Sequence, residues 1–308
     1  MKPTAPLRCN FSEVSQVQLV SLLQIIILSL IQGLCELLPV SSSAHVLVAA
    51  KLLGIDPSSP EMTFLLVMVH TGTMFAVIVY FWNSWRQDYF TSRTAIGIAI
   101  KELTIATAAT GAVGGALLIS IEKVILRGEP KAEVEMLFSN FTLISIALAT
   151  VGILIFAAGN GRRGESVGVA SNASSIGAWR SLCIGAVQGL CLPFRGFSRS
   201  GATISTGLML GATRLDSEKF SFALAVILTP PVILRELLRL LKAHSGAGEV
   251  ISLSILILPG VIGMICSFLA GLVALRWLSR WLEQGRWQWF GVYCLVAAAA
   301  VFLISRYA

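Results

Sequence analysis

Charged residues are scarce in this 308-residue sequence, where they make up 13% of the chain. Soluble proteins have about 25% charged residues. Hydrophobic residues make up 56% of the chain, and the mean hydropathy is +0.81. This composition excludes an ordinary soluble domain and predicts an integral membrane protein.

Two further features are missing. The six cysteines include no C-x-x-C pair, so we interpret them as small buried hydrophobic residues rather than as disulfide partners or metal ligands. No pattern typical of a signal peptide occurs in the polar N-terminal stretch. The net charge of +7 comes from basic residues scattered over loops and helix ends, which favours contact with anionic membrane lipid and no nucleic-acid partner.

Six apolar stretches are long enough to cross the hydrocarbon as helices, which takes roughly 17–25 residues. We expect the all-α spans at residues 64–82, 103–121, 141–158, 220–238, 250–275 and 289–304, with a charged connection at 86–101. A capping box between Ser15 and Gln18 could start a first, shorter helix near Val17. The basic residues place both chain ends on the outer side of the membrane.

The chain contains an internal duplication. Gln188 to Cys191 repeats Gln32 to Cys35, and residues 198–201 follow the similar residues 41–44 by 157 positions. The expected organisation is one membrane domain made of two halves. A polar lead-in at 1–18 precedes a first half at 19–159, a linker at 160–180 and a second half at 181–308.

A polar turn interrupts the first apolar stretch of each half. Pro39 and the following serines break the first of these stretches, which predicts a re-entrant helix-loop-helix pair that enters the membrane and turns back. Each half then has three full spans, an odd number, so the second half must enter from the opposite face. We therefore expect an inverted-topology repeat whose two loops meet near the bilayer midplane.

The second loop has the composition of an anion site. Residues 195–203 combine arginines, hydroxyls and glycines where a helix should restart. Arginine donates in pairs to phosphate oxygens, and a helix N-terminus adds free N–H groups. Alternatively Arg199 forms a structural ion pair with Glu36, which does not exclude phosphate binding.

The first loop supplies complementary groups. Gln32 and Glu36 lie four residues apart on one helix face, and a carboxylate near a phosphate-binding arginine is typical of a divalent-cation site. Glu36 could instead act as a base. Ser42 and its neighbours could supply a nucleophile or only cap a helix, and His45 on the next turn could take the proton of Ser42. His70 could face the same site, although a lone histidine is more often structural.

The two loops resemble the motifs of the undecaprenyl pyrophosphate phosphatases, the bacitracin-resistance family of bacterial membrane phosphatases. The resemblance covers the chain from about Leu19. The family's first motif is similar to Gln32, Glu36, residues 39–42 and His45, and its second motif is similar to residues 195–203. Arg195 replaces a proline of the second motif, and Ala44 replaces a common glycine.

The resemblance implies an enzyme of the bacterial plasma (inner) membrane that hydrolyses undecaprenyl pyrophosphate, a polyprenyl lipid, to undecaprenyl phosphate with Mg²⁺ or Ca²⁺. The catalytic residues would be Glu36, Ser42, His45 and Arg199. Glu36 and Gln32 would hold the metal. Substrate-binding residues would be Gln32, Ser41, Ser43, Arg195, Ser198, Ser200, Gly201 and Thr203.

Two other classes deserve comparison. A transporter or flippase also uses inverted repeats with broken helices, but serine, histidine, carboxylate and arginine at one point favour chemistry. The acid-phosphatase-like lipid phosphatases have a histidine and then an aspartate a few residues after Ser-Arg. Ser198-Arg199 has no histidine nearby, which excludes this class. A homodimer is compatible with the sequence.

Overall fold

The computed structural model describes residues 21–56, 59–121, 123, 140–161, 175–246 and 253–307, and within these segments it contains ten helices and no strand. The first five helices are α1 (Leu22–Leu37), α2 (Ser42–Leu52), α3 (Pro60–Tyr89), α4 (Arg93–Ser120) and α6 (Phe141–Asn160). The last five are α7 (Ala178–Cys191), α8 (Arg199–Met209), α9 (Arg214–Gly246), α10 (Leu253–Glu283) and α11 (Gln288–Tyr307). The polar lead-in at 1–18 and most of the linker at 160–180 lie outside the described residues.

Six of the helices, α3, α4, α6, α9, α10 and α11, are long and apolar enough to cross a membrane. Each overlaps one of the predicted spans, so the prediction of a multi-pass helical membrane protein is confirmed. The helices extend beyond the apolar stretches, and most of the charged stretch at 86–101 is helical. Hydropathy marks only the part of a helix in contact with hydrocarbon, whereas arginine and lysine continue a helix readily in water.

Polar side chains cap the helix starts. Ser21 and Gln24 form a capping box before α1, in which Ser21 N donates to Gln24 Oε1 over 2.8 Å and Gln24 N donates to Ser21 Oγ over 3.3 Å. Ser59, Ser92 and Asn140 cap α3, α4 and α6 with side chains that accept hydrogen bonds from backbone N–H groups of the first turn. The predicted capping box of Ser15 and Gln18 lies outside the part of the chain that the structure describes.

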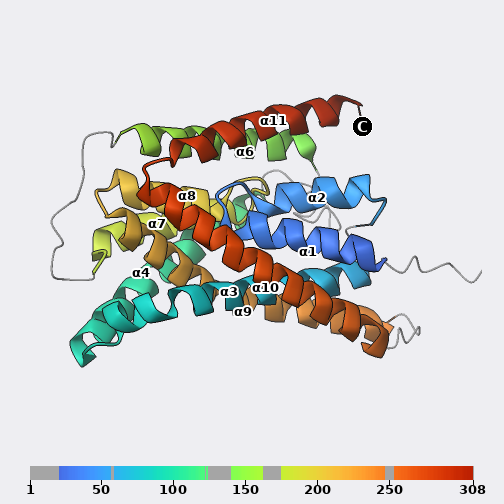
Figure 1. The fold of residues 1–308 in the computed structure, drawn as a ribbon, viewed down its shortest axis with the longest axis horizontal. Helices are drawn as coiled ribbons and strands as arrows, with labels where there is room; N and C mark the ends of the chain where they lie inside the picture. The colour runs from blue at the N-terminus through green and yellow to red at the C-terminus, as the bar shows by residue number, and fades with distance from the viewer. Residues whose placement is uncertain are drawn as a thin grey trace, which may run out of the picture.

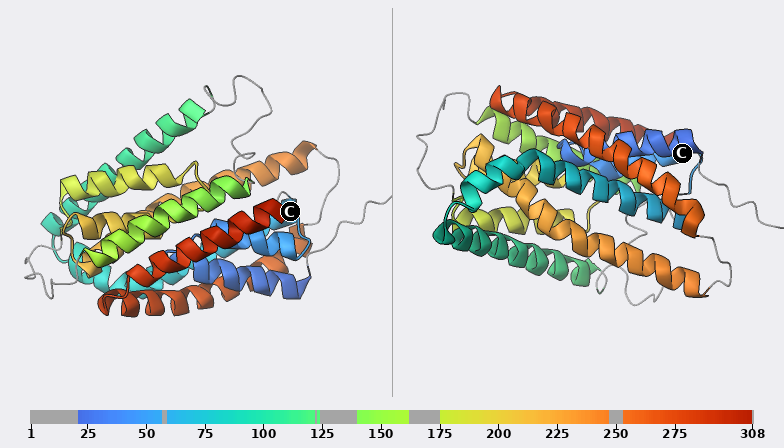
Figure 2. Two further views of the ribbon diagram at one scale, coloured as in Figure 1. Left: turned by 90° about the horizontal axis from the view of Figure 1, so that it is seen from above. Right: turned by 60° about the horizontal axis from the view of Figure 1, so that its bottom comes forward.

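The two short helix pairs lie toward opposite ends of the molecule, α1 and α2 on the right of Figure 1 and α7 and α8 on the left. The loop between α1 and α2 and the loop between α7 and α8 meet in the interior. On one face of the molecule α6 and α11 lie side by side (Figure 2), and Ser145 Oγ donates to the carbonyl of Ala298 over 2.8 Å.

Glycine allows the short helices to approach their neighbours closely. A Cβ atom on Gly33 of α1 would lie 2.6 Å from the Ser267 carbonyl oxygen of α10, and one on Gly189 of α7 would lie 2.9 Å from the Thr110 carbonyl oxygen of α4. Small residues at helix interfaces are typical of packing in lipid. Each of these short helices therefore packs against a long helix from the other part of the chain.

The largest hydrophobic core surrounds the two loops. It includes Leu37, Leu38 and Val40 around the first loop and Ala202 and Ile204 of α8. Side chains of α3, α6, α9, α10 and α11 complete this core. The polar residues of the loops are consequently held in a densely packed surrounding, which restricts their side chains to few rotamers.

Candidate active site

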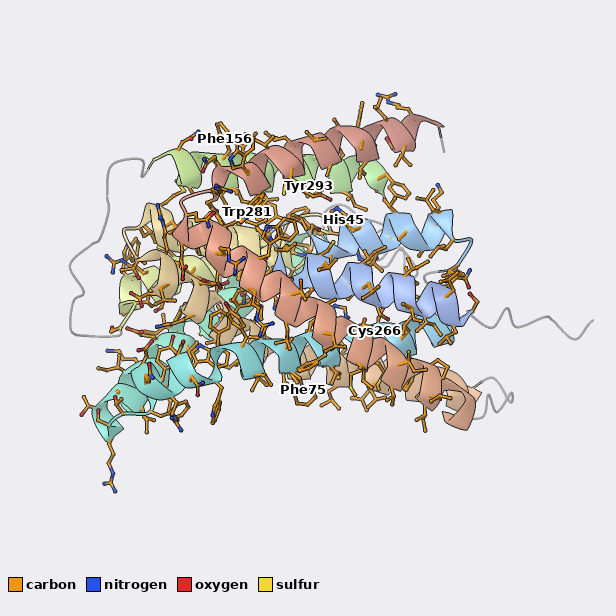
Figure 3. All side chains as sticks on the ribbon, viewed as in Figure 1. His45, Phe75, Phe156, Cys266, Trp281 and Tyr293 are labelled. Carbon is orange, nitrogen blue, oxygen red and sulfur yellow. The ribbon has the colours of Figure 1, made fainter. Side chains whose placement is uncertain are left out.

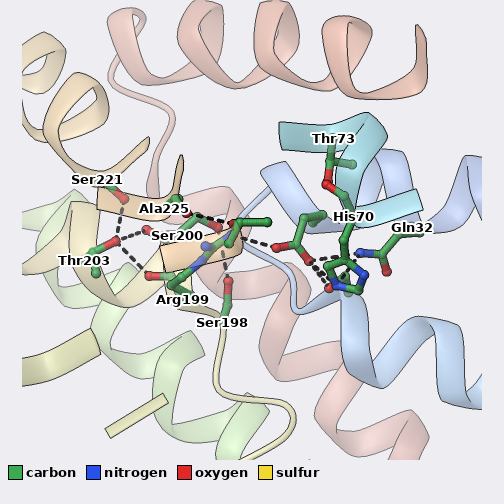
Figure 4. Close-up of polar contacts among 12 residues, drawn as sticks. Gln32, His70, Thr73, Ser198, Arg199, Ser200, Thr203, Ser221 and Ala225 are labelled. Atoms are coloured by element: carbon green, nitrogen blue, oxygen red, sulfur yellow. Dashed lines mark hydrogen bonds and ion pairs between the residues drawn. The ribbon is translucent and has the colours of Figure 1, made fainter. Parts of the chain in front are cut away.

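Glu36, at the end of α1, joins the two loops. Its Oε1 accepts a hydrogen bond from Arg199 Nη2 over 2.6 Å, and its Oε2 accepts one from Ser42 Oγ, also over 2.6 Å. The Glu36 side chain is 16% exposed and that of Arg199 is 26% exposed. One carboxylate therefore contacts the hydroxyl at the start of α2 and the guanidinium at the start of α8. Figure 4 shows Arg199 on one side of this region and Gln32 and His70 on the other.

The backbone of the first loop aims Ser42 at Glu36. The chain leaves α1 at Leu37, before Pro39, and turns sharply so that α2 begins at Ser42. Ser41 has a φ of 67°, in the left-handed region that residues other than glycine rarely adopt. Such strained residues persist where the surrounding structure holds them, and they are frequent at active sites.

The second loop presents Arg199 at the first position of α8. Ser198 caps this helix by accepting a hydrogen bond from Gly201 N over 3.3 Å. Ser200 Oγ donates to the carbonyl of Leu38 over 3.2 Å, which fastens the start of α8 to the first loop. The N-terminus of α8, with its free N–H groups and positive dipole, thus lies beside Glu36 and Ser42.

Gln32 and His70 form the other side of the site. Gln32 Nε2 lies 3.1 Å from Glu36 Oε2 and 3.1 Å from His70 Nε2. His70 Nδ1 lies 2.7 Å from the carbonyl oxygen of Leu66. A carbonyl only accepts, so Nδ1 carries the hydrogen and Nε2 accepts from the amide of Gln32. His70, which the sequence left open between a site role and a structural role, therefore faces Glu36.

A small cavity opens at this point, between α1, α3, α8 and α9. Its polar lining comprises Glu36, His70, Thr73, Arg199 and Thr229, and its apolar lining comprises Leu37, Met74, Val77, Ala225 and Val226. Thr73 and Thr229 were not among the site residues expected from the sequence. Thr73 lies three residues after His70 on α3, so helical spacing could have identified it once His70 was placed.

His45 points elsewhere. Its Nδ1 donates to the carbonyl of Ser41 over 2.8 Å, and its Nε2 lies 2.7 Å from Tyr293 Oη on α11. The two rings stack, and Figure 3 places them side by side. Ser42 donates its hydrogen bond to Glu36 in this structure, and the transfer of its proton to His45 stays a prediction. Tyr293 lies 248 residues away in sequence, so no local sequence pattern could predict this contact.

The other site residues expected from the sequence lie in or beside the two loops. Most of their hydrogen bonds are to other atoms of the protein. Ser43 Oγ accepts from Gly196 N over 3.4 Å and lies 3.3 Å from Ser41 Oγ. Thr203 Oγ1 donates to the Arg199 carbonyl over 2.8 Å. It also lies 2.5 Å from the hydroxyl of Ser221, which the sequence analysis did not single out.

Among the substrate-binding residues expected from the sequence, Ser198, Ser200, Gly201 and Thr203 are buried. Arg195 is half-buried in the loop before α8. These positions support the loops around Arg199. Direct contact of these residues with a substrate stays a prediction.

The residues near Glu36 fit a weakly held divalent cation. In the described segments no group of three or more His, Cys, Asp or Glu side chains could hold a metal ion. Glu36, Gln32 and His70 nevertheless bring a carboxylate, an amide and an imidazole together. Mg²⁺ in phosphate-processing sites typically uses one or two carboxylates and takes its other ligands from substrate phosphates and water. The side chains present are therefore compatible with such an ion.

Comparison with known proteins identifies the family. Residues 25–300 match the family model described as bacitracin resistance protein BacA. Undecaprenyl-diphosphatase 2 of Acinetobacter baylyi is 54% identical over 92% of this chain and 98% of its own length. The undecaprenyl-diphosphatase of Desulfosudis oleivorans is 34% identical over 92% of this chain and 98% of its own length. The chain belongs to the bacitracin resistance protein BacA family.

Proposed function

We propose that this protein is an undecaprenyl-diphosphatase, which hydrolyses undecaprenyl pyrophosphate to undecaprenyl phosphate and inorganic phosphate and so recycles the lipid carrier of cell-wall synthesis. The names of its relatives support this activity. The structural observation that carries the proposal is the Glu36 carboxylate between Ser42 and Arg199. A nucleophile, a base and a phosphate-binding cation are then within reach of one another.

In the first step Ser42 Oγ attacks the terminal phosphorus. An O–P bond forms, the proton of Ser42 passes to Glu36 Oε2, and the bond from phosphorus to the bridging oxygen breaks. Undecaprenyl phosphate leaves with the electron pair of that bond. Glu36 fits the role of base because it already accepts the Ser42 hydrogen bond over 2.6 Å.

In the second step water attacks the phosphoserine. The Ser42 Oγ–P bond breaks, Ser42 recovers its proton from Glu36, and both protons of the water leave on inorganic phosphate. Ser42 and Glu36 are thereby restored. His45 is not in contact with Ser42 in this structure, so its predicted catalytic role would depend on the substrate complex.

Arg199 and the N-terminus of α8 would hold the phosphate oxygens, since a guanidinium and free backbone N–H groups match a phosphate dianion. A divalent cation, Mg²⁺ or Ca²⁺, bound by Glu36 and Gln32 would neutralise part of the pyrophosphate charge. The lipid tail would extend along the apolar residues that line the cavity, such as Met74, Val77 and Val226.

The proposal includes an inverted repeat of two halves, 19–159 and 181–308, each with one re-entrant pair. Matching helix lengths favour it, because α2 and α8 both have 11 residues and α6 and α11 both have 20. The equivalent glycines Gly33 and Gly189 each pack against the other half. The lipid substrate implies the bacterial inner membrane. A homodimer is also part of the proposal, and light scattering of the purified protein tests it.

The deciding experiment measures phosphate release from a polyprenyl pyrophosphate by the purified protein, with and without a metal chelator. We expect release that the chelator abolishes and that Glu36→Ala and Arg199→Ala each reduce to near background. Full activity in both variants would refute the proposed site. Transport of the lipid between leaflets without phosphate release would identify a transporter instead.

A further inference from the structure

We infer that His70 is a third ligand of the divalent-cation site and that it makes the site bind Mn²⁺ more tightly than Mg²⁺ or Ca²⁺. This inference rests on the proposed function, which assigns the cation to Glu36 and Gln32. It concerns a side chain of α3, outside both loops that carry the family resemblance.

The first observation is the spacing of the candidate ligand atoms. Glu36 Oε2 and His70 Nε2 are 3.9 Å apart, and the Gln32 amide group lies 3.1 Å from each of them. Adjacent ligands of an ion held at 2.0–2.1 Å in octahedral geometry are about 3 Å apart. Half a turn of the Gln32 amide would replace its NH₂ group by its carbonyl oxygen. Glu36 Oε2, His70 Nε2 and Gln32 Oε1 would then form a group of three acceptor atoms.

The second observation is the orientation of the imidazole. His70 donates its Nδ1 hydrogen to the carbonyl of Leu66, so the lone pair of Nε2 faces Gln32 and Glu36. Metal-binding histidines almost always donate their other ring hydrogen to a carbonyl or carboxylate, which fixes the tautomer and the ring orientation. His70 therefore has the tautomer and the supporting hydrogen bond of a ligand.

The surrounding structure holds His70 in this position and leaves it accessible. A Cβ atom on the nearby Gly72 would lie 2.7 Å from Ser267 Oγ, so this turn of α3 packs tightly against α10. The His70 side chain is 35% exposed and lines the cavity together with Glu36 and Arg199. An ion and a phosphate entering that cavity would meet the imidazole directly.

His45 provides an internal contrast. It makes the same kind of Nδ1 hydrogen bond, to the carbonyl of Ser41, but its Nε2 lies against the hydroxyl of Tyr293 rather than against a carboxylate. Its ring also stacks on that tyrosine. Both histidines donate an Nδ1 hydrogen to a backbone carbonyl, and they differ in the partner of Nε2. His70 is therefore a candidate ligand, whereas His45 joins α2 and α11.

The nature of the ligand determines the preferred ion. Carboxylate and amide oxygens suit Mg²⁺, Ca²⁺ and Mn²⁺, whereas an imidazole nitrogen favours first-row transition metals over Mg²⁺ and Ca²⁺. We expect Mn²⁺ to bind the wild-type protein at least about tenfold more tightly than Mg²⁺, and His70→Gln to remove most of that preference.

The test is Mn²⁺ binding followed by electron spin-echo envelope modulation, which detects a nitrogen directly bound to the metal. The chain has three histidines, His45, His70 and His244, so a purification tag without histidine allows the signal to be assigned. We expect ¹⁴N modulation in the wild type, its loss in His70→Gln, and its retention in His45→Asn and in His244→Asn.

The outcomes separate the inference from the proposed function. Bound Mn²⁺ without ¹⁴N modulation in the wild type, or modulation that survives in His70→Gln, would overturn His70 as a ligand even if phosphate release is normal. Absence of specific Mn²⁺ binding would overturn it as well. Absence of phosphate release with every metal would refute the proposed function, whatever the spectra show. If His70→Gln fails to fold, retention of the modulation in both His45→Asn and His244→Asn assigns the bound nitrogen to His70, and its loss in either variant overturns that assignment.

Discussion

The two loops at the centre of this protein have similar sequences and different chemistry. Gln32 to Cys35 and Gln188 to Cys191 are identical, but the next residue is Glu36 in the first copy and Leu192 in the second. Leu192 is 46% exposed and contributes only apolar surface. At the start of the following helices, Ser42 in the first copy is matched by Arg199 in the second. The carboxylate and hydroxyl thus come from one loop and the guanidinium from the other.

The glutamines at equivalent positions of the two copies also have different surroundings. Gln32 donates to Glu36 and lies against His70 in the site. Gln188 is 1% exposed and donates to Thr110 Oγ1 of α4 over 3.3 Å, while its Oε1 has no hydrogen-bond partner among the described residues. The same residue at equivalent positions therefore lies in the candidate site in one copy and between two packed helices in the other.

The largest expected effect comes from removing the proposed nucleophile. Ser42→Ala should lower the rate of phosphate release by on the order of 10⁴-fold or more, since removing the nucleophile disables the whole catalytic unit. Ser43→Ala is the matched control. Ser43 contacts Gly196 N rather than Glu36, so the rate of phosphate release should fall far less in Ser43→Ala. Equal losses in the two variants would contradict the assignment of Ser42.

Arg199→Lys tests the contribution of the second loop. Lysine keeps the positive charge but cannot donate to two phosphate oxygens from a planar group. We expect kcat to fall by about 10²-fold, as for the loss of one donor that stabilises a transition state. Steady-state kinetics over a range of substrate concentrations measure this. A variant with wild-type kcat would show that only the charge matters.

The helix contacts at the two equivalent glycines should contribute equally to stability. Gly33→Ala and Gly189→Ala would each force a methyl group against a neighbouring backbone, and we expect each to lower the free energy of unfolding by about 1–3 kcal/mol. Gly97→Ala on α4 is the control, because nothing among the described residues lies within 4 Å of its added Cβ. Thermal unfolding in detergent compares the three. A loss in only one of the two glycine variants would show that the two contacts are not equivalent.

Substitutions of the two equivalent glutamines should differ in their effect on activity. Gln32→Leu removes the hydrogen bond to Glu36 and should lower phosphate release roughly tenfold, as for partners that orient catalytic or metal-binding groups. Gln188→Leu should leave activity unchanged, because Thr110 Oγ1 keeps its contacts with the Ala106 and Gly185 carbonyls. Phosphate-release assays of both variants measure this. A comparable loss of activity in Gln188→Leu would give the second copy a catalytic role.

Much of the fold was predictable because membrane spans need long apolar stretches. All six spans were found from hydropathy, but not their ends. Residues 93–101 were assigned to a charged connection, but they form the first turns of α4, because only Arg93 and Lys101 among them are charged and the rest of the segment is mostly apolar. The structure begins α1 at Leu22 with a capping box of Ser21 and Gln24, whereas the capping box expected at Ser15 and Gln18 lies outside the described residues.

The site was predictable only in part. The motif residues Glu36, Ser42 and Arg199 were expected together, and the structure places them in contact. The positions of His70 and His45 depend on which helix packs beside them. His70 meets Gln32 because α3 lies against α1, and His45 meets Tyr293 because α11 lies beside α2. A local sequence pattern contains no information about such contacts.

The ion pair between Arg199 and Glu36 has a consequence for affinity. A phosphate that binds Arg199 Nη2 competes with the Glu36 carboxylate for that donor, so substrate binding at this atom exchanges one anion for another around a fixed cation. The guanidinium therefore has an anionic partner both before and after binding, which avoids the cost of an unpaired cation in a surrounding of low polarity. The strength of binding is then set by the difference between two ion pairs. Inorganic phosphate, the product, competes for the same exchange.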